Sequence, residues 1–399
     1  MTLAAAERPR AAAAPHAGED EVLALYVHWP FCVSKCPYCD FNSHVRAAVD
    51  QEAWREALLR DLAHEARQTK ARKLGSIFFG GGTPSLMPPG TVAALIEAAA
   101  AHWSFTPGIE ITLEANPSSV EAARFADIAA AGVNRVSLGI QSLEDRDLRF
   151  LGRAHDVAEA LAALDIAQSI FDRVSVDLIY ALPQQDESVW RAQLERALGF
   201  GTGHVSLYQL TIEPGTRFAA LAAKGELEPI DPDRAAALYE LTQAISGQAG
   251  LRAYEISNHA RTNEESRHNL AYWRYKDYCG IGPGAHGRRG ANVTQRHKKP
   301  ENWLAAVARA GQGMAEELPL SARQQAAEAL LMGLRLSEGV DLERIAARTG
   351  LRAGTLVDQD RIARLGRHGL VDLDGERLRV TPAGRLLLDS ILAEIVRAV

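Results

Sequence analysis

The sequence predicts an α/β protein with a smaller second domain, and three observations carry that prediction. The 399 residues exceed what a single hydrophobic core usually holds. Hydrophobic residues make up 47% and charged residues 24%, which is typical of folded globular proteins. From about residue 23, short β-rich runs alternate with longer helical segments. Six such units form either a doubly wound sheet or a partial barrel, and both place ligands at the carboxyl ends of the strands.

The expected strands are runs of β-branched or apolar residues bounded by glycine, proline or polar residues. They cover 23–28, 76–80, 109–114, 135–139, 173–180 and 204–210. The helical segments between them are long enough to connect parallel strands. They cover 51–68, 90–102, 119–131, 156–169 and 188–199. Ser118 and Glu121 predict a capping box at the start of the third helix, and Gly132 predicts its end.

The alternation stops near Pro214. A helix is expected over 232–249 and a short β run over 253–257. They lead into an irregular segment, 258–300, which is rich in aromatic residues, glycine and charge. We interpret this stretch as an elaboration of the first domain rather than as a seventh strand–helix unit.

The last part of the chain predicts a winged-helix-like domain. Helices are expected over 321–336, 341–348 and 355–367. Asp374-Gly375 predicts a hairpin, and Thr381 is expected to cap a final helix. The whole chain is therefore divided into a disordered tail over 1–22, a strand–helix domain over 23–215, its elaboration over 216–320 and a C-terminal domain over 321–399.

Charge and hydropathy exclude several classes of function. The net charge of −6 gives no general attraction to nucleic acid or anionic lipid. The winged-helix-like region holds 12 arginines, no lysine and 11 acidic residues, a poor footprint for binding phosphates. No apolar run reaches the ~18 residues of a membrane helix. The first twenty residues also lack the uninterrupted apolar core of a secretory signal, so we expect a cytoplasmic protein.

Three of the four cysteines form a C-x3-C-x2-C motif directly after the first strand: Cys32, Cys36 and Cys39. Three thiolates on one short loop can bind three irons of a [4Fe–4S] cluster and leave the fourth iron open. The alternative is structural zinc, which needs a fourth ligand from His28, His44 or Asp40. Cys279 stands alone in the sequence and is expected in the core.

Polar residues and glycines recur where the expected strands end. A glycine-rich turn at 80–84 follows the second strand and lacks the lysine of a phosphate loop. Glu114, Gln141, Arg153 and Asp177 fall at or near the next strands. Each alone is an ordinary structural or surface residue, but together they predict one shared cavity. A G-x-G-x-x-G match at 282–287 lacks the helix that a dinucleotide site needs.

These motifs, together with EANP, GIQS, LGRAH and VDLIYALP, resemble the radical S-adenosylmethionine (SAM) superfamily over roughly residues 23–399. Within it, the chain resembles the group related to oxygen-independent coproporphyrinogen III oxidase. The resemblance implies a partial (β/α)6 barrel with a winged C-terminus, and a [4Fe–4S] cluster whose open iron is chelated by SAM. It also implies a SAM pocket formed by Tyr26, Tyr38, Gly81, Gly82, Thr83, Glu114, Gln141, Arg153, Asp177 and Thr211.

Two features resemble the HemW branch of this group, the heme chaperones. The oxidases carry another cysteine two residues after the third cluster ligand, where this chain has Phe41. Residues 268–273 form an HNxxYW segment, which that branch associates with heme binding. By resemblance, heme contacts His268, Asn269, Tyr272 and Trp273.

The chemistry of the HNxxYW segment agrees with heme, although His268 is also compatible with a purely structural role. A neutral imidazole can ligate heme iron, and aromatic rings can cover a porphyrin face. A basic run that follows the segment is expected either to meet the propionates or to form a solvated surface. It comprises Arg288, Arg289, Arg296, Lys298 and Lys299.

We therefore expect a heme chaperone that passes heme to an acceptor protein and receives electrons for its cluster from a donor. The alternative is an enzyme, an oxygen-independent coproporphyrinogen III oxidase acting through a 5′-deoxyadenosyl radical. A zinc-stabilised nucleic-acid-binding protein is disfavoured by the charge and by the strand-end motifs.

Overall fold

The computed structural model describes residues 21–396. Of the tail expected over 1–22, residues 1–20 therefore lie outside the described residues, and Val22 already begins the first strand. No helix in the described range is long and apolar enough to cross a membrane.

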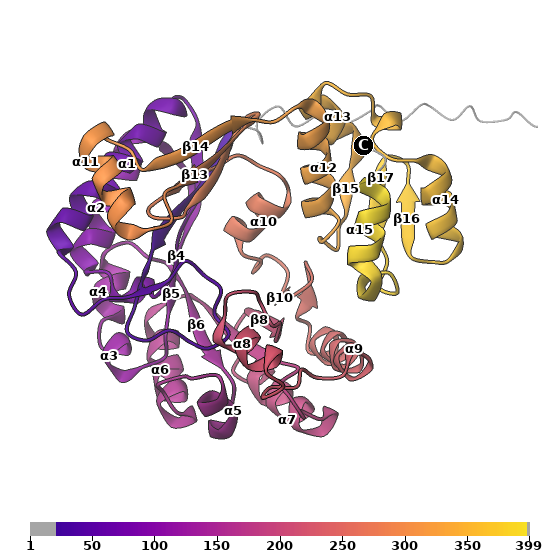
Figure 1. The fold of residues 1–399 in the computed structure, drawn as a ribbon, viewed down its shortest axis with the longest axis horizontal. Coiled ribbons are helices and arrows are strands. Elements are labelled where there is room, and N and C mark those ends of the chain that lie inside the picture. The colour runs from indigo at the N-terminus through magenta and orange to yellow at the C-terminus, as the bar shows by residue number, and fades with distance from the viewer. Residues whose placement is uncertain (1–20, 397–399) are drawn as a thin grey trace, which may run out of the picture.

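Six parallel strands form the central part of a twelve-stranded sheet (Figure 1). They pair in the order β1-β4-β5-β6-β7-β8, so each strand lies beside the next one of the series. A doubly wound sheet requires a reversal of strand order, and none occurs here. The expected α/β fold is therefore confirmed, with the strands arranged as a partial barrel. The strands are β1 (Val22–Trp29), β4 (Lys73–Gly81), β5 (Ser104–Ala115), β6 (Arg135–Gln141), β7 (Arg173–Tyr180) and β8 (His204–Gln209).

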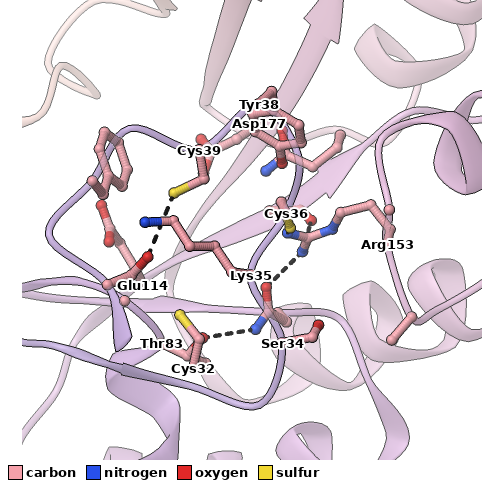
Figure 2. Close-up of a pocket in the computed structure, with 18 of the residues that line it drawn as sticks. Cys32, Ser34, Lys35, Cys36, Tyr38, Cys39, Thr83, Glu114, Arg153 and Asp177 are labelled. Atoms are coloured by element: carbon pink, nitrogen blue, oxygen red, sulfur yellow. Dashed lines mark hydrogen bonds between the residues drawn. The ribbon is translucent and has the colours of Figure 1, made fainter. Parts of the chain in front are cut away.

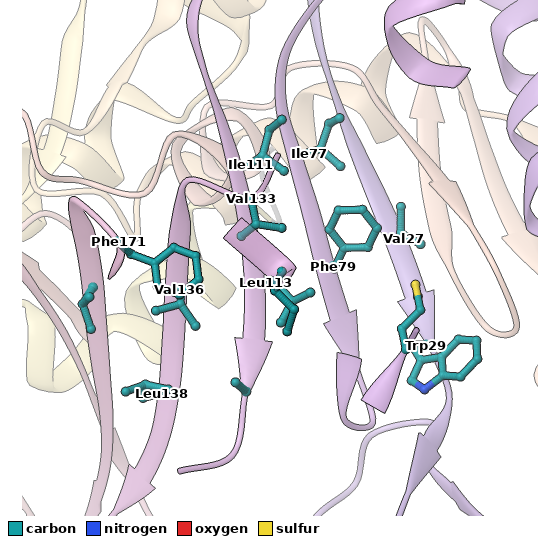
Figure 3. Packing of buried hydrophobic residues seen from close by; sticks show 14 of the residues in the cluster. Val27, Trp29, Ile77, Phe79, Ile111, Leu113, Val133, Val136, Leu138 and Phe171 are labelled. Carbon is teal, nitrogen blue, oxygen red and sulfur yellow. The ribbon is translucent and has the colours of Figure 1, made fainter. Parts of the chain in front are cut away.

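Helices cover the outer face of these strands (Figure 1). Alternate strand residues such as Val27, Phe79 and Leu113 point toward the helices and form the main core (Figure 3). The opposite face of the same strands carries polar side chains such as Glu114 and Asp177. The helices are α1 (Gln51–Gln68), η1 (Pro84–Leu86), α2 (Pro89–His102), α3 (Ser119–Ala122), α4 (Phe125–Ala130), α5 (Asp145–Phe150), α6 (Val157–Ile170) and α7 (Glu187–Leu198).

The third helix departs from the prediction, because α3 and α4 replace one continuous helix over 119–131. Ser118 caps α3 by accepting a hydrogen bond from the Glu121 backbone N–H at 3.3 Å. The Glu121 carboxylate does not complete a capping box. It accepts instead from the Asn116 backbone N–H at 2.9 Å and from the Ser85 hydroxyl. The prediction of a capping box was therefore only partly right. Ser118 caps the helix, but the Glu121 carboxylate binds Ser85 and the Asn116 backbone instead of the Ser118 N–H.

The segment 258–300 is more regular than the sequence indicated. It contains a short helix and an antiparallel meander, which continues to β14 and extends the sheet beyond β1. β11 pairs parallel with β1, so this addition does not continue the series after β8. Its elements are β10 (Asn258–Ala260), α10 (Arg267–Trp273), β11 (Tyr278–Ile281), β12 (His286–Arg289), β13 (Asn292–Arg296), α11 (Pro300–Ala310) and β14 (Met314–Pro319).

A buried ion cluster fixes this meander to α1. Arg296 is fully buried and its guanidinium contacts Asp61 at 3.3 Å and Glu65 at 2.5 Å. Asp61 also accepts hydrogen bonds from the backbone of Gly282 and from the Trp303 indole, both at 3.2 Å. Because a buried charge is costly without partners, this set of contacts holds the meander in one register.

The remaining elements complete the sheet edges and the small domain. Two short strands, β2 (Phe31–Cys32) and β3 (His44–Val45), enclose the cysteine loop. After β8 come α8 (Arg217–Ala223), α9 (Pro232–Gln248) and β9 (Arg252–Ala253). The expected β run over 253–257 is thus wrong, since it lies mostly between β9 and β10.

The C-terminal domain has its own apolar core and a three-stranded sheet, and it stands beside the barrel (Figure 1). The predicted hairpin at Asp374-Gly375 joins two of the strands. Thr381 caps a turn rather than the last helix, because its hydroxyl accepts from the Gly384 N–H at 3.1 Å. The elements are α12 (Ala322–Gly333), β15 (Val340–Asp341), α13 (Leu342–Thr349), η2 (Ala353–Thr355), α14 (Gln359–Arg367), β16 (Val371–Asp374), β17 (Arg377–Val380), η3 (Arg385–Leu387) and α15 (Leu388–Val396).

Candidate functional site

A cavity of about 630 Å³ opens at the carboxyl ends of the six parallel strands. Its walls come from the cysteine loop and from the ends of β4, β5, β6, β7 and β8. Figure 2 shows the three thiols, Arg153, Glu114 and Asp177 around one space. The parallel fold therefore brings together side chains that lie up to 181 residues apart in the sequence, from Cys32 to Glu213.

Each thiol of the cysteine loop contacts a polar group of the cavity wall. The Thr83 hydroxyl donates to the Cys32 Sγ at 3.4 Å, and the Arg153 Nη1 donates to the Cys36 Sγ at 3.6 Å. The Cys39 Sγ lies 3.8 Å from the Ser43 hydroxyl. Burial raises the pKa of the Cys32 and Cys39 thiols. Burial thus favours the neutral thiols, and a bound cation would favour the thiolates.

The two histidines that could complete a zinc site with these thiols are both engaged in hydrogen bonds. Within residues 21–396, no three His, Cys, Asp or Glu side chains converge as the ligands of one ion. His28 is also engaged at both ring nitrogens, with the Tyr26 hydroxyl at 3.0 Å and the Asn42 carbonyl at 2.9 Å. His44 contacts the Asn42 side chain at 3.2 Å. Three thiols that line one cavity can each bind one iron of a [4Fe–4S] cluster.

Arg153 is held in the cavity wall by several acceptors. Its Nη2 donates to the Asn116 side chain at 2.5 Å and to the Gly139 carbonyl at 3.0 Å. Its Nε is buried without a hydrogen-bond partner among the described residues. An unsatisfied buried guanidinium N–H is costly, and a ligand carboxylate in the cavity would satisfy it.

Two buried carboxyl groups face the same cavity. Burial, reinforced by the nearby Asp177, raises the pKa of Glu114 to about 8, although the Gly81 backbone N–H donates to it at 3.2 Å. Burial also raises the pKa of Asp177, which accepts from the Ser137 hydroxyl at 3.1 Å. The pair favours a positively charged ligand, because such a ligand would stabilise the ionised carboxylates.

The glycine turn brings backbone close to the cysteine loop. Gly81 has a φ of 115°, and a side chain at this position would collide with the His28 ring. A Cβ on Gly82 would lie 3.0 Å from the Cys32 Sγ and 2.8 Å from the Phe31 carbonyl. Glycine is therefore required here by close approach as well as by backbone conformation.

Nine of the ten residues expected to bind SAM line this cavity. They are Tyr38, Gly81, Gly82, Thr83, Glu114, Gln141, Arg153, Asp177 and Thr211. Gln141 has a φ of 69° where β6 ends, and such local strain is common in binding sites. The structure places the tenth, Tyr26, behind the wall, where its hydroxyl bonds to His28.

Sequence reasoning missed other residues of the wall. Asn116 connects Arg153 to Thr83, which its side-chain amide contacts at 3.3 Å. Tyr208 lines the cavity from β8, and His155 lines it beside Arg153. Burial lowers the pKa of His155 to about 4, so this ring is neutral. Asn116 lies just after the expected strand 109–114, and Tyr208 lies near the end of the expected strand 204–210. These positions near strand ends were the signal that could have found both residues.

The HNxxYW segment forms α10, on the side of the barrel away from the strand-end cavity. His268 is buried, its Nδ1 lies 3.2 Å from the Ser76 hydroxyl, and its ring stacks on Phe78. Its backbone N–H donates to the Glu110 carboxylate at 3.2 Å. Burial lowers the pKa of His268 to about 4. The imidazole is therefore neutral, as an iron ligand must be, but it is enclosed by protein.

The outer part of α10 faces the C-terminal domain (Figure 1). Tyr272 is 37% exposed, and its ring contacts Trp273 and Tyr278 edge-on. The guanidinium of Arg335, which follows α12, lies 5.0 Å from the centre of the Trp273 ring. Of the residues expected to contact heme, His268 is thus buried, whereas Tyr272 and Trp273 form the accessible aromatic side of α10.

The five residues of the basic run also fall into a buried group and an exposed group. Arg296 belongs to the buried ion cluster, Arg289 pairs with Glu65 and Glu317, and Arg288 is buried against the Tyr275 ring. These three side chains stabilise the meander, so the expectation that they meet propionates was wrong. Lys298 and Lys299 are exposed, but they lie on the side of the cysteine loop. The sequence could not separate these cases, because all five residues fall within twelve positions.

Comparisons with known proteins agree with this geometry. Residues 26–194 match the radical SAM superfamily, and residues 320–387 match the HemN C-terminal domain. The heme chaperone HemW of Mycobacterium tuberculosis is 37% identical over 93% of this chain and 94% of its own length. HemW of Escherichia coli is 35% identical over 93% and 97%. This chain belongs to the HemW branch of the radical SAM family.

Eukaryotic proteins are also similar to this chain. The mitochondrial radical S-adenosyl methionine domain-containing protein 1 of Bos taurus is 41% identical over 94% of this chain and 87% of its own length. Among solved structures, the coproporphyrinogen III oxidase HemN of Escherichia coli superposes with a TM-score of 0.78 at 24% identity. That likeness covers 94% of this chain and 91% of HemN, and it concerns the fold. Membership of the radical SAM family implies a [4Fe–4S] cluster and SAM.

Proposed function

We propose that this chain is a heme chaperone: it binds heme, carries a [4Fe–4S] cluster with SAM, and passes the heme to an acceptor protein. The observation that carries the proposal is the similarity to bacterial HemW proteins over nearly the whole chain. Phe41 supports it, because this residue stands at the cavity where the oxidases have an additional cysteine.

In this proposal, Cys32, Cys36 and Cys39 hold the cluster at the wall of the strand-end cavity. SAM would bind beside the cluster in this cavity, and the cluster would supply one electron for its chemistry. Arg153 orients the SAM carboxylate through its free Nε, and Glu114 and Asp177 stabilise the positive sulfonium. Because Gly81 and Gly82 carry no side chains, the ligand can approach the backbone of this turn closely.

We further propose that heme binds along α10. Tyr272 offers an accessible aromatic face, and Trp273 lies next to it. The His268 Nδ1 is engaged with the Ser76 hydroxyl, so iron ligation through this nitrogen would require that contact to open. The Asn269 side-chain amide donates to the Tyr254 hydroxyl at 3.4 Å.

Anaerobic reconstitution tests the proposal against the oxidase alternative. The cluster-loaded protein with SAM and a reductant should form no protoporphyrinogen IX from coproporphyrinogen III. The same preparation should bind about one heme per chain, measured by its Soret absorption. Turnover of coproporphyrinogen III at the rate of a true oxidase, without heme binding, would establish the enzyme instead.

Accessible and buried parts of the heme site can be separated by variants. Tyr272→Ala should weaken heme binding without loss of the fold, because this side chain is partly exposed. Leu318→Ala is the matched control, since Leu318 is 53% exposed on β14. Equal heme affinity in both variants would remove Tyr272 from the site.

The proposal also includes a cytoplasmic location, a heme-accepting protein and an electron donor. Fractionation of cells that express the tagged chain, followed by crosslinking, would locate the protein and capture the acceptor. Recovery with an organelle or a membrane fraction would contradict the cytoplasmic assignment.

A further inference from the structure

The segment that follows α12 places the C-terminal domain against the outer side of the barrel. The Ser337 backbone N–H donates to the Tyr254 carbonyl at 2.9 Å, and the Ser337 hydroxyl donates to the Ala253 carbonyl. A Cβ on Gly333, the last residue of α12, would lie 3.8 Å from the Trp273 carbonyl oxygen. The start of this segment therefore lies beside the end of α10.

Arg335 carries a positive charge at this contact. Its side chain is partly buried, its guanidinium lies 5.0 Å from the centre of the Trp273 ring, and its Nε is buried without a hydrogen-bond partner. No ion pair of Arg335 occurs within residues 21–396. A guanidinium that stacks on a ring keeps its N–H groups in its own plane, so it can still donate to a carboxylate.

A second guanidinium, that of Arg385, lies near the same segment. It donates to the Ser337 hydroxyl and forms no ion pair in the described part of the chain. Burial raises the pKa of Tyr239 on α9, and the positive charges of Arg385 and Arg335 both lower it. The two guanidiniums therefore lie near the same hydroxyl group. We call Arg335 and Arg385 the arginine pair.

The acidic side chains around the arginine pair mostly have basic partners. Glu338 is paired with Arg274 at 2.7 Å, and Glu328 lies 3.9 Å from the Arg288 guanidinium. Glu255 also acts on Tyr239, but it is 1% exposed and accepts from a backbone N–H at 2.9 Å. The arginine pair thus faces one further carboxylate, and the excess positive charge favours an anionic ligand.

We propose that the arginine pair binds the propionate carboxylates of heme, so that the C-terminal domain forms part of the heme site. The inference rests on the proposed binding of heme along α10. Arg288, Arg289 and Arg296 cannot take this role, because they stabilise the meander. Arginine suits it, since a guanidinium can donate two parallel N–H bonds to one carboxylate.

Titration of the full-length protein with hemin and with hemin dimethyl ester tests the inference, because the ester keeps the ring but loses the carboxylate charges. Arg335→Gln should bind hemin about three- to tenfold more weakly at low salt, with the affinity for the ester unchanged. Arg335→Lys should retain part of the difference. Arg323→Gln is the matched control, since Arg323 is exposed at the opposite end of α12.

Arg385→Gln provides an independent variant and should show the same selective loss of hemin affinity. Urea denaturation of each variant checks that the fold is kept. Hemin binding by both Arg335→Gln and Arg385→Gln that equals binding by the parent and by Arg323→Gln would overturn the inference. So would an equal loss of hemin and ester binding, since Arg335 would then act through its packing on Trp273 rather than through its charge.

The two proposals fail in different ways in this experiment. A parent that binds hemin and its ester equally well would leave heme binding at α10 intact and would remove the arginine pair from the site. A parent that binds neither porphyrin would contradict the heme-chaperone proposal itself, and the inference with it.

Discussion

The two ends of the barrel hold the two strongest motifs of the sequence, but they differ in how far their polar groups are satisfied. At the strand-end cavity, Arg153 keeps a buried N–H without a partner, and Glu114 has a pKa of about 8. At α10, His268 is stacked on Phe78 and bonded to Ser76, and its backbone is bonded to Glu110. The first end is arranged for a ligand, and the second is arranged for the protein itself.

The difference shows that a sequence motif can indicate which ligand a site binds without showing whether its side chains are accessible to that ligand. Unsatisfied buried groups are costly, so a fold retains them where a ligand completes them. The buried and stacked ring of His268, with its Nδ1 bonded to Ser76, stabilises the apoprotein, and iron ligation through this nitrogen would cost that hydrogen bond. Ligand binding at α10 should therefore be slower and weaker than the aromatic motif alone suggests.

The largest expected effect is at the cysteine loop. Replacing Cys32, Cys36 or Cys39 by serine should abolish the iron–sulfur chromophore after anaerobic reconstitution, because each thiolate binds one iron. Cys279→Ser is the control, since Cys279 is buried in the core on β11. Iron and sulfide analysis checks the result, and stoichiometric zinc in their place would refute the cluster.

A second variant probes the buried histidine. His268→Ala should lower the free energy of unfolding by about 2–4 kcal/mol, because it leaves a cavity and unpairs the Ser76 hydroxyl. Tyr272→Ala should cost much less, since Tyr272 is partly exposed. Urea denaturation of both variants gives the comparison. Similar losses would mean that the two sides of α10 do not differ as the structure indicates.

Removing the guanidinium of Arg153 tests the open end of the barrel. Arg153→Ala should weaken SAM binding by about 1.5–3 kcal/mol, or roughly ten- to a hundredfold, through loss of a charge-assisted hydrogen bond. Calorimetry on cluster-loaded protein measures it. Arg191→Ala serves as control, because Arg191 lies on the surface of α7 and its pair with Glu195 spans 3.8 Å. An unchanged affinity in Arg153→Ala would exclude this residue from the site.

The smallest effect is a pH dependence that comes from Glu114. Because the pKa of Glu114 is about 8, this carboxyl group is protonated at pH 7, and a cationic ligand must displace its proton. SAM affinity should therefore rise by at most tenfold per pH unit toward pH 8 and then level off. Glu114→Gln should flatten this rise, as calorimetry in buffers of different ionisation enthalpy would show.

The same group predicts a change in stability of opposite sense. Between its ordinary pKa of 4.5 and about 8, Glu114 holds a proton in the folded state that it loses in the unfolded state. Its contribution to the free energy of unfolding is therefore complete below pH 4.5 and is lost as the pH rises to 8. Denaturation without SAM should show this decline in the parent and less of it in Glu114→Gln.

The sequence by itself determined the features that depend on local pattern. β-branched runs separated by helical segments predicted all six parallel strands, and consecutive units must pair in sequence order when no reversal occurs. Cys32, Cys36 and Cys39 are near in sequence, so their grouping needed no tertiary information. Polar residues at strand ends converge for the same topological reason.

Only the tertiary structure decided which polar residues are free. Glu121 could complete a capping box, but Ser85 and the Asn116 backbone took its carboxylate. Arg296 and Lys298 stand two positions apart, yet the first is buried against Asp61 and the second is exposed beside the cysteine loop. These outcomes depend on partners far away in the chain, and burial makes such long-range contacts stronger than any local preference.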